Sequence, residues 1–205
     1  MIRLSLPATD AEIAALKVGD QVLLSGTIIT GRDAAHHYMI ENFIKREPPE
    51  SERQMYEILR RALAGNVIYH CGPVVAKENG KYRFVAAGPT TSIREEPYEH
   101  LVIEKFNVKG VIGKGGMGAK TLEACRKFKA AYFHAIGGAA TYIAQSVKEV
   151  IDVYKLDLGV PEAMWLIRVE DFPAVVTMDS HGGSLHAEVE ARSKQKLEEL
   201  LSTIK

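Results

Sequence analysis

The second half of this 205-residue chain alternates short apolar runs that end at glycines with segments of helical periodicity. The runs at 110–113 (GVIG) and 131–138 (AYFHAIGG) lead straight into glycine turns, which is typical of buried strands. Helical patterns follow at 118–128 and 141–156. Strands that alternate with helices favour an α/β fold.

Three further extended runs give the rest of the chain β character. Residues 21–30 (QVLLSGTIIT) and 66–75 (NVIYHCGPVV) are predicted strands, and Asn79-Gly80 between two extended runs is a strong hairpin signal. Residues 163–180 predict one or two more strands. Together with the alternating half, these runs predict a mixed sheet or barrel with helices packed outside it.

Helices are also predicted at 33–46, 51–63 and 98–107, and a charged helix at 186–204 closes the chain. A pair of prolines separates the first two of these helices, because proline cannot continue a helix interior. No stretch has the composition of a linker, so we predict that residues 1–205 form a single domain.

Composition excludes several classes of protein. Apolar residues make up 46% of the chain and charged residues 25%, which is typical of an ordinary globular protein. The 26 acidic and 26 basic residues balance, so charge gives no reason to expect nucleic acid or a membrane as partner. No apolar run approaches a membrane span and the N-terminus lacks a signal-peptide core, so we expect a cytoplasmic protein.

The two cysteines, Cys71 and Cys125, lie far apart and have no paired spacing. A disulfide framework is therefore not expected, and two cysteines cannot by themselves supply the usual ligands of an iron–sulfur cluster. His181 and His186 form a loop pair without a third ligand, which favours a structural role. We predict no metal site in this chain.

The stretch GVIGKGGMGAKT at 110–121 is close to a phosphate-binding loop. Gly113 and Gly118 have the separation of the G-x-x-x-x-G-K-[ST] pattern, but Ala119 stands where the lysine should be. We therefore predict no nucleotide site. The backbone N–H groups at the start of the following helix still favour an anion, and Lys114 in the turn supplies a positive charge.

Polar residues gather at three predicted strand ends, which is where ligands bind in α/β folds. The segments are TGRDAAH (30–36), AAGPTTSIRE (86–95) and GKGGMG (113–118). If they converge, they bring together two arginines, a lysine and a hydroxyl, which suits a dicarboxylate because arginine binds carboxylates bidentately. The hydroxyl could move a proton if neighbouring cations tune its proton affinity. The alternative, in which each cation is a solvated surface charge, stays open on these residues alone.

Five motifs together resemble the β subunit, equivalently the C-terminal domain, of class I iron–sulfur fumarate hydratases and the related L-tartrate dehydratases. They are TGRDAAH, IYHCGPVV, AAGPTTSIRE, VIGKGGMG and HAIGGAA, in this order over nearly the whole chain. The resemblance implies the swivelling β/β/α domain fold and an active site divided between two subunits. A partner α subunit would hold a four-iron four-sulfur cluster through three cysteines, and this chain would complete the pocket in a hetero-oligomer.

The resemblance also implies roles for particular residues. Thr90 corresponds to the catalytic base that exchanges a proton at a substrate carbon; Arg32, Arg94 and Lys114 to groups that bind the substrate; and Asp33 and His36 to supporting residues. The implied reaction is the reversible addition of water to the C4 dicarboxylate fumarate, giving L-malate, with L-tartrate dehydration as the alternative. A stand-alone anion-binding module is the alternative from another class.

Overall fold

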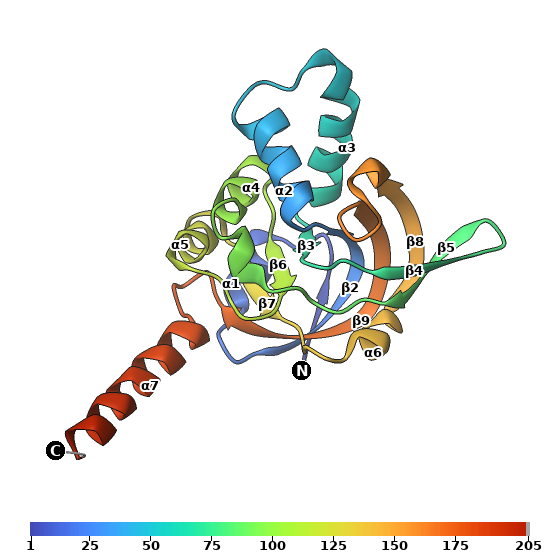
Figure 1. Ribbon diagram of the computed structural model, residues 1–205. Helices are drawn as coiled ribbons and strands as arrows, with labels where there is room; N and C mark the ends of the chain where they lie inside the picture. The colour runs from blue at the N-terminus through green and yellow to red at the C-terminus, as the bar shows by residue number, and fades with distance from the viewer. Residues whose placement is uncertain (204–205) are drawn as a thin grey trace.

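A computed structural model describes residues 1–203 as a closed arrangement of strands with helices outside it and one helix that projects from the body (Figure 1). The strands are β1 (Ile2–Ser5), β2 (Gln21–Thr30), β3 (Val67–Tyr69), β4 (Val74–Glu78), β5 (Lys81–Ala86), β6 (Gly110–Gly113), β7 (Ala131–His134), β8 (Val147–Tyr154) and β9 (Met164–Met178). The α-helices are α1 (Asp10–Ala15), α2 (Asp33–Met39), α3 (Arg53–Leu63), α4 (Glu99–Phe106), α5 (Ala119–Phe128), α6 (Ala140–Ala144) and α7 (Leu185–Ser202). Short helical turns are η1 (Ile40–Ile44), η2 (Glu50–Glu52), η3 (Ser92–Glu95) and η4 (Leu156–Leu158).

Five strands close into a mixed barrel. β2, β3, β6 and β7 pair in parallel in that order, and β9 pairs antiparallel with both β7 and β2, which closes the ring. β1 extends the sheet on β2 and β8 extends it on β9. The predicted mixed sheet or barrel with external helices is thus confirmed. Because β2, β3, β6 and β7 are parallel, their carboxyl ends lie at one end of the barrel. The segments 30–36 and 113–118 follow β2 and β6 there, and 86–95, which follows β5 outside the barrel, reaches the same end through bridges from Pro89 to Cys71 and from Thr91 to Lys114.

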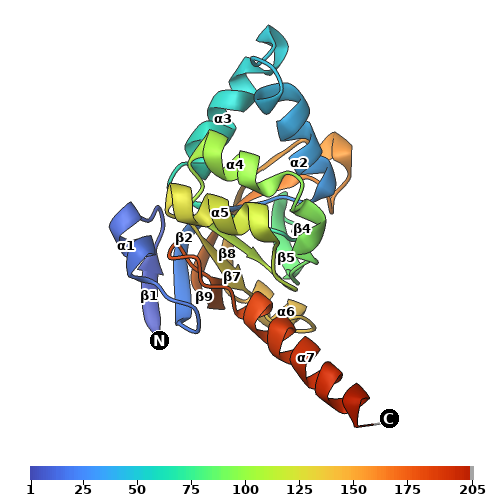
Figure 2. The same ribbon diagram turned by 90° about the vertical axis from the view of Figure 1, so that its left-hand side faces the viewer.

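Side chains along the barrel strands alternate between two apolar clusters, as the two-residue period of a strand requires. Tyr69 and Phe133 face the cluster inside the barrel, whereas their neighbours Ile68 and Tyr132 face the cluster under the helices. Figure 2 shows α2 to α5 gathered on one side of the strands, where they cover that second cluster. Strands buried on both faces explain why the short apolar runs are uninterrupted in the sequence.

The helix predicted at 141–156 is wrong: only Ala140–Ala144 is helical, and Val147–Tyr154 forms strand β8 against β9. Val147, Val150 and Val153 recur every three residues, a spacing that resembles a helix. Two irregularities in the β8–β9 register fall between these valines. Each β-bulge adds a residue to one strand, so side chains three apart return to the same face, and all three valines pack on the barrel core.

Other segments agree with the sequence. The hairpin β4–β5 turns at Asn79 and Gly80, which both have positive φ, and the strands predicted within 163–180 form one long strand, β9, at Met164–Met178. β1 and α1 were not predicted, although α1 begins at a capping box formed by Thr9 and Glu12. The predicted helix 186–204 is α7; residue 204 lies outside the described residues.

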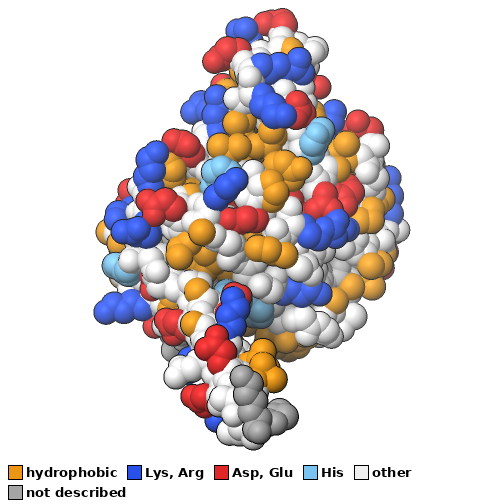
Figure 3. Space-filling model, turned by 60° about the vertical axis from the view of Figure 1, so that its left-hand side comes forward, with side chains coloured by type: hydrophobic (Ala, Val, Ile, Leu, Met, Phe, Trp, Pro, Cys, Tyr) orange, Lys and Arg blue, Asp and Glu red, His pale blue; other side chains and the backbone are white. Residues whose placement is uncertain are grey.

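The surface is mixed in charge. Figure 3 shows lysine, arginine and carboxylate side chains interspersed over one face, with no broad region of a single sign, in agreement with the balanced composition. No helix within residues 1–203 combines the length and apolar character needed to cross a membrane.

Candidate functional site

Thr90 lies between the ends of two barrel strands. Its N–H donates to the carbonyl of His70, just after β3, at 2.7 Å, and its carbonyl accepts from the N–H of Lys114, just after β6, at 3.2 Å. The N–H of Ser92 then donates to the Lys114 carbonyl at 2.9 Å. The segment therefore continues the sheet pattern past the strand ends, with Thr91 as the register partner of Lys114. It brings the main chain of the predicted base next to that of the predicted lysine.

Lys114 is half-buried and its chain runs past the second glycine turn, since a Cβ on Gly137 would lie 3.5 Å from Lys114 Cδ. None of the ion pairs found among residues 1–203 includes Lys114. This leaves its ammonium group able to accept an anion beside Thr90.

Arg32 follows β2 and is held partly buried at the same end of the barrel. Its Nη2 lies 3.4 Å from Glu162 Oε1, and both side chains are 22% exposed. The other oxygen of Glu162 accepts from the N–H of Ala34 at the start of α2, at 3.1 Å. A Cβ on Gly72 would lie 2.9 Å from the carbonyl of Pro161 and would also collide with the Arg32 guanidinium, so glycine is needed there to make room for the arginine.

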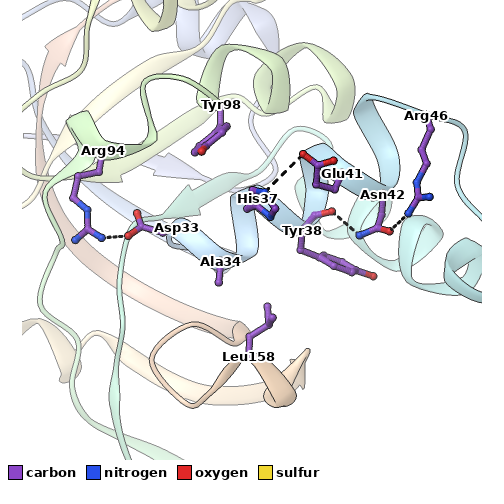
Figure 4. A pocket seen from close by; sticks show the side chains of 10 residues that line it. All are labelled: Asp33, Ala34, His37, Tyr38, Glu41, Asn42, Arg46, Arg94, Tyr98 and Leu158. Carbon is purple, nitrogen blue, oxygen red and sulfur yellow. Dashed lines mark hydrogen bonds and ion pairs between the residues drawn. The ribbon is translucent and has the colours of Figure 1, made fainter.

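Arg94 and Asp33 form an ion pair at one end of an open groove along α2 (Figure 4). Tyr38, Tyr98 and Leu158 contribute apolar surface to this groove, whose lining includes neither Thr90 nor Lys114. The structure therefore pairs Asp33 with Arg94 and Thr90 with Lys114, all at the same end of the barrel, without enclosing them in one cavity.

The anion predicted at the start of α5 is a carboxylate of the chain itself. Glu96 accepts from the N–H groups of Gly118 at 2.7 Å, Lys120 at 2.9 Å and Thr121 at 3.3 Å, and from the Thr121 hydroxyl at 2.7 Å. Four donors converge on one side chain, as they do on a phosphate in a phosphate-binding loop. The glycine-rich stretch is thus already filled, which agrees with the prediction that it binds no nucleotide.

A network of four buried polar side chains lies behind the Thr90 segment. His36 Nε2 and His70 Nε2 both lie against Glu99 Oε2, at 2.8 and 2.9 Å, and His70 Nδ1 lies 2.8 Å from Ser92 Oγ. All four side chains are fully buried. We call His36, Glu99, His70 and Ser92 the buried network. Of these, only His36 was predicted at the site.

Two contacts tie this network to the strand ends. His36 Nδ1 lies 2.9 Å from the carbonyl of Arg32, and the Tyr132 hydroxyl donates to Ser92 Oγ at 2.9 Å. The network therefore connects the ends of β2 and β3 with the Thr90 segment.

The charges in the network follow from its contacts. Burial alone would lower the pKa of His36, but the Glu99 carboxylate, with Glu95 in support, outweighs burial and raises that pKa to about 9. Burial would likewise raise the pKa of Glu99, but His36 and His70 bring it down to about 2. For His70, burial prevails and lowers the pKa, helped by the nearby charge of His36. At neutral pH the network therefore holds one imidazolium, one carboxylate and one neutral imidazole.

Histidine and carboxylate atoms of His36, His70 and Glu99 lie within 4.8 Å of one another, a grouping that can hold a metal ion. Their separations of 2.8 and 2.9 Å are hydrogen-bond distances, and Glu99 takes up both Nε2 atoms. His181 and His186 have separate roles: His181 Nε2 donates to the Ala14 carbonyl, and His186 Nε2 pairs with the Thr177 hydroxyl.

The sequence matches the family described as "Fumarase C-terminus" over residues 1–189. It is 50% identical over 198 residues to a protein of Geobacillus stearothermophilus named "Putative fumarate hydratase class I", covering 96% of this chain and 36% of that protein. It is 41% identical over 186 residues to the Escherichia coli strain K12 protein named "L(+)-tartrate dehydratase subunit beta", covering 90% of this chain and 86% of that one. These matches confirm the resemblance drawn from the five motifs.

Proposed function

We propose that this chain, which belongs to the Fumarase C-terminus family, is the β subunit of a two-subunit hydro-lyase that interconverts fumarate and L-malate. The observation that carries the proposal is the backbone pairing of Thr90 with His70 and Lys114, which holds the main chain of the proposed base and that of the lysine together at the strand ends. A base must stand within reach of the proton that it moves, and a nearby cation stabilises the negative charge that develops.

In this proposal Arg32, Arg94 and Lys114 bind the two carboxylates of the substrate, and Thr90 exchanges a proton at a substrate carbon. Asp33 and His36 support them: Asp33 by its ion pair with Arg94, and His36 through the backbone of Arg32. Substrate carboxylates would replace the present carboxylate partners of the arginines. Threonine is a weak base, so Thr90 needs help: the positive charge of Lys114 would lower the pKa of its hydroxyl, or a carboxylate from a partner would accept the hydroxyl proton.

The family resemblance implies a four-iron four-sulfur cluster, and the cysteines of this chain do not fit one. Cys71 and Cys125 are fully buried in different apolar clusters. Burial raises the pKa of both thiols, that of Cys71 to about 12, whereas cluster ligation requires thiolates. We therefore propose that a partner α subunit holds the cluster and assembles with this chain in the cytoplasm. The steps assigned to this chain are substrate binding and proton exchange.

L-tartrate dehydration is the second candidate, favoured by the match in length to the Escherichia coli relative, of which this chain covers 86%. The test is anaerobic: this chain is produced with its partner, and conversion of fumarate and L-tartrate is followed side by side, with each chain alone as control. Conversion of fumarate by the pair supports the first candidate, and preference for L-tartrate supports the second. Conversion of neither by a pair with a loaded cluster would favour a stand-alone anion-binding module.

The same assay tests the role of Thr90. Thr90→Ala should lower kcat by about 100-fold or more with a smaller effect on KM, because it removes a proton-transfer group. Thr91→Ala, which removes the neighbouring exposed hydroxyl, is the matched control. Full activity of Thr90→Ala would exclude it as the base.

A further inference from the structure

Hydrogen-bond chemistry fixes where the protons of the buried network lie. The carbonyl of Arg32 and an ionised Glu99 can only accept, so with Glu99 ionised both ring nitrogens of His36 donate to them. His36 is therefore an imidazolium when Glu99 is ionised, and the lowered pKa of that carboxyl supports its ionisation.

The same reasoning orients the rest of the network. His70 Nε2 donates to Glu99, which leaves Nδ1 of the neutral ring to accept from the Ser92 hydroxyl. Ser92 Oγ in turn accepts from the Tyr132 hydroxyl. Each group thus donates to the next in the order Tyr132, Ser92, His70 and Glu99. The Ser92 hydroxyl has a single orientation that satisfies both of its neighbours.

We propose that Ser92, His70 and Glu99 are positioning residues that hold Thr90 in place. This inference rests on the proposed function for its catalytic consequence. The backbone of His70 bonds Thr90 directly, and its ring bonds the side chain two residues further along, so one residue holds the segment at two points. A hydrogen-bonded buried network makes a segment rigid; every polar side-chain atom of this one is bonded except Glu99 Oε1, which has no partner among residues 1–203. A shift of about 1 Å in a catalytic group can lower turnover about 100-fold.

His36 also connects the buried network to Arg32, a proposed substrate-binding residue. His36 donates to the Arg32 carbonyl and is held by the same Glu99 oxygen that accepts from His70. The backbone that carries a proposed substrate arginine and the segment that carries the proposed base are therefore joined through one buried carboxylate. A change in Glu99 should disturb both.

A metal ion is the competing interpretation of the His36, His70 and Glu99 group. Metal-bound histidine nitrogens carry no proton, whereas here both Nε2 atoms lie at hydrogen-bond distance from one oxygen of Glu99 and donate to it when it is ionised. The positions of the partners therefore favour the hydrogen-bonded network.

The test combines backbone amide exchange in this chain with kinetics in the active pair. Ser92→Ala removes the hydroxyl that links the segment to His70. The control is Ser180→Ala, because Ser180 is also buried and its hydroxyl has no hydrogen-bond partner among residues 1–203. We expect the amides of Thr90, Ser92 and Lys114 to exchange about 10-fold faster or more in Ser92→Ala, with β8 and β9 unchanged.

In the pair we expect Ser92→Ala to lower kcat about 10-fold with KM nearly unchanged, and Glu99→Gln to lower kcat and raise KM. Unchanged exchange in Ser92→Ala, or acceleration spread evenly over the sheet, would overturn the positioning role, as would normal kinetics. A stoichiometric metal in the purified chain that Glu99→Gln loses would overturn it too. If the wild-type pair converts neither substrate, the proposed function fails, and amide exchange still decides whether the network holds the segment.

Discussion

The buried ion pair between His36 and Glu99 makes a quantitative prediction about stability and pH. Glu99→Gln preserves the size of the side chain and an oxygen that can accept from both histidines, and it removes the charge. Without the carboxylate, burial should dominate at His36 and keep its imidazole neutral. The variant therefore isolates the electrostatic part of the network from its packing.

The magnitude follows from the pKa of His36, which rises from 6.5 to about 9 in the folded chain. At about 1.4 kcal/mol for each unit of pKa, this difference corresponds to about 3 kcal/mol. The low pKa of Glu99 reports the same attraction from the other partner, so the two contributions are not added. A loss of about 3 kcal/mol is a large share of the ~5–15 kcal/mol that holds a typical domain folded.

The sign of the pH dependence is fixed by the direction of that change. Between pH 6.5 and about 9 the folded chain keeps a proton on His36 that the unfolded chain releases. The stabilisation is therefore complete below pH 6.5 and is lost as the pH rises through about 9. Glu99→Gln should lower the free energy of unfolding by about 3 kcal/mol near pH 6, and the difference from wild type should shrink steadily towards pH 9.

Urea unfolding of both proteins at a series of pH values measures this difference. Glu190→Gln is the control, because it removes a carboxylate from an exposed ion pair with Lys194 on α7 and exposed pairs contribute little. A loss in Glu99→Gln that is the same at pH 6 and pH 9 would show that packing is responsible, and the assignment of His36 as a cation would be refuted.

Three further predictions concern residues around the strand ends. Glu96→Ala should lower the free energy of unfolding by about 2 kcal/mol, because it leaves the donors at the start of α5 without their acceptor. Glu96→Gln should lower this free energy by less. Equal stability of the wild type and both variants in urea would contradict this prediction. Gly72→Ala should displace Arg32 and raise KM about 10-fold with less effect on kcat, and an unchanged KM in steady-state kinetics would remove Arg32 from substrate binding. Arg94→Ala should lower kcat and raise KM. Arg94→Lys should restore only part of each value, because lysine cannot bind a carboxylate bidentately. Complete rescue by lysine in steady-state kinetics would show that charge alone matters.

The sequence was sufficient for features that are encoded locally. Apolar runs that end at glycines predicted β6 and β7, and the Asn79-Gly80 pair predicted the β4–β5 hairpin. It failed at β8, where two bulges give valines a helical spacing, because bulges depend on the pairing partner and leave no mark in the strand's own sequence.

The buried network could not be predicted from the sequence, for a related reason. His70 lies inside one of the five motifs, yet neither its full burial nor its bond to Glu99, 29 positions away, can be inferred from local pattern. Glu99 looks like the first-turn acidic residue of a solvated helix. Only the fold turns it inward, where it becomes the shared acceptor of two histidines.

The structure also shows which groups occupy the backbone donors at the starts of α2 and α5. Glu96 fills the start of α5, and Glu162 bonds the start of α2 while it pairs with Arg32. Backbone donors that would serve a phosphate are therefore taken by the chain's own carboxylates, and under the proposed function a substrate dianion would be bound by side chains. Arginines already paired with carboxylates are held in the geometry that a substrate carboxylate needs, so binding exchanges one carboxylate for another with little ordering of side chains. That arrangement favours orientation over tight binding, which would suit turnover of a small dicarboxylate under the proposed function.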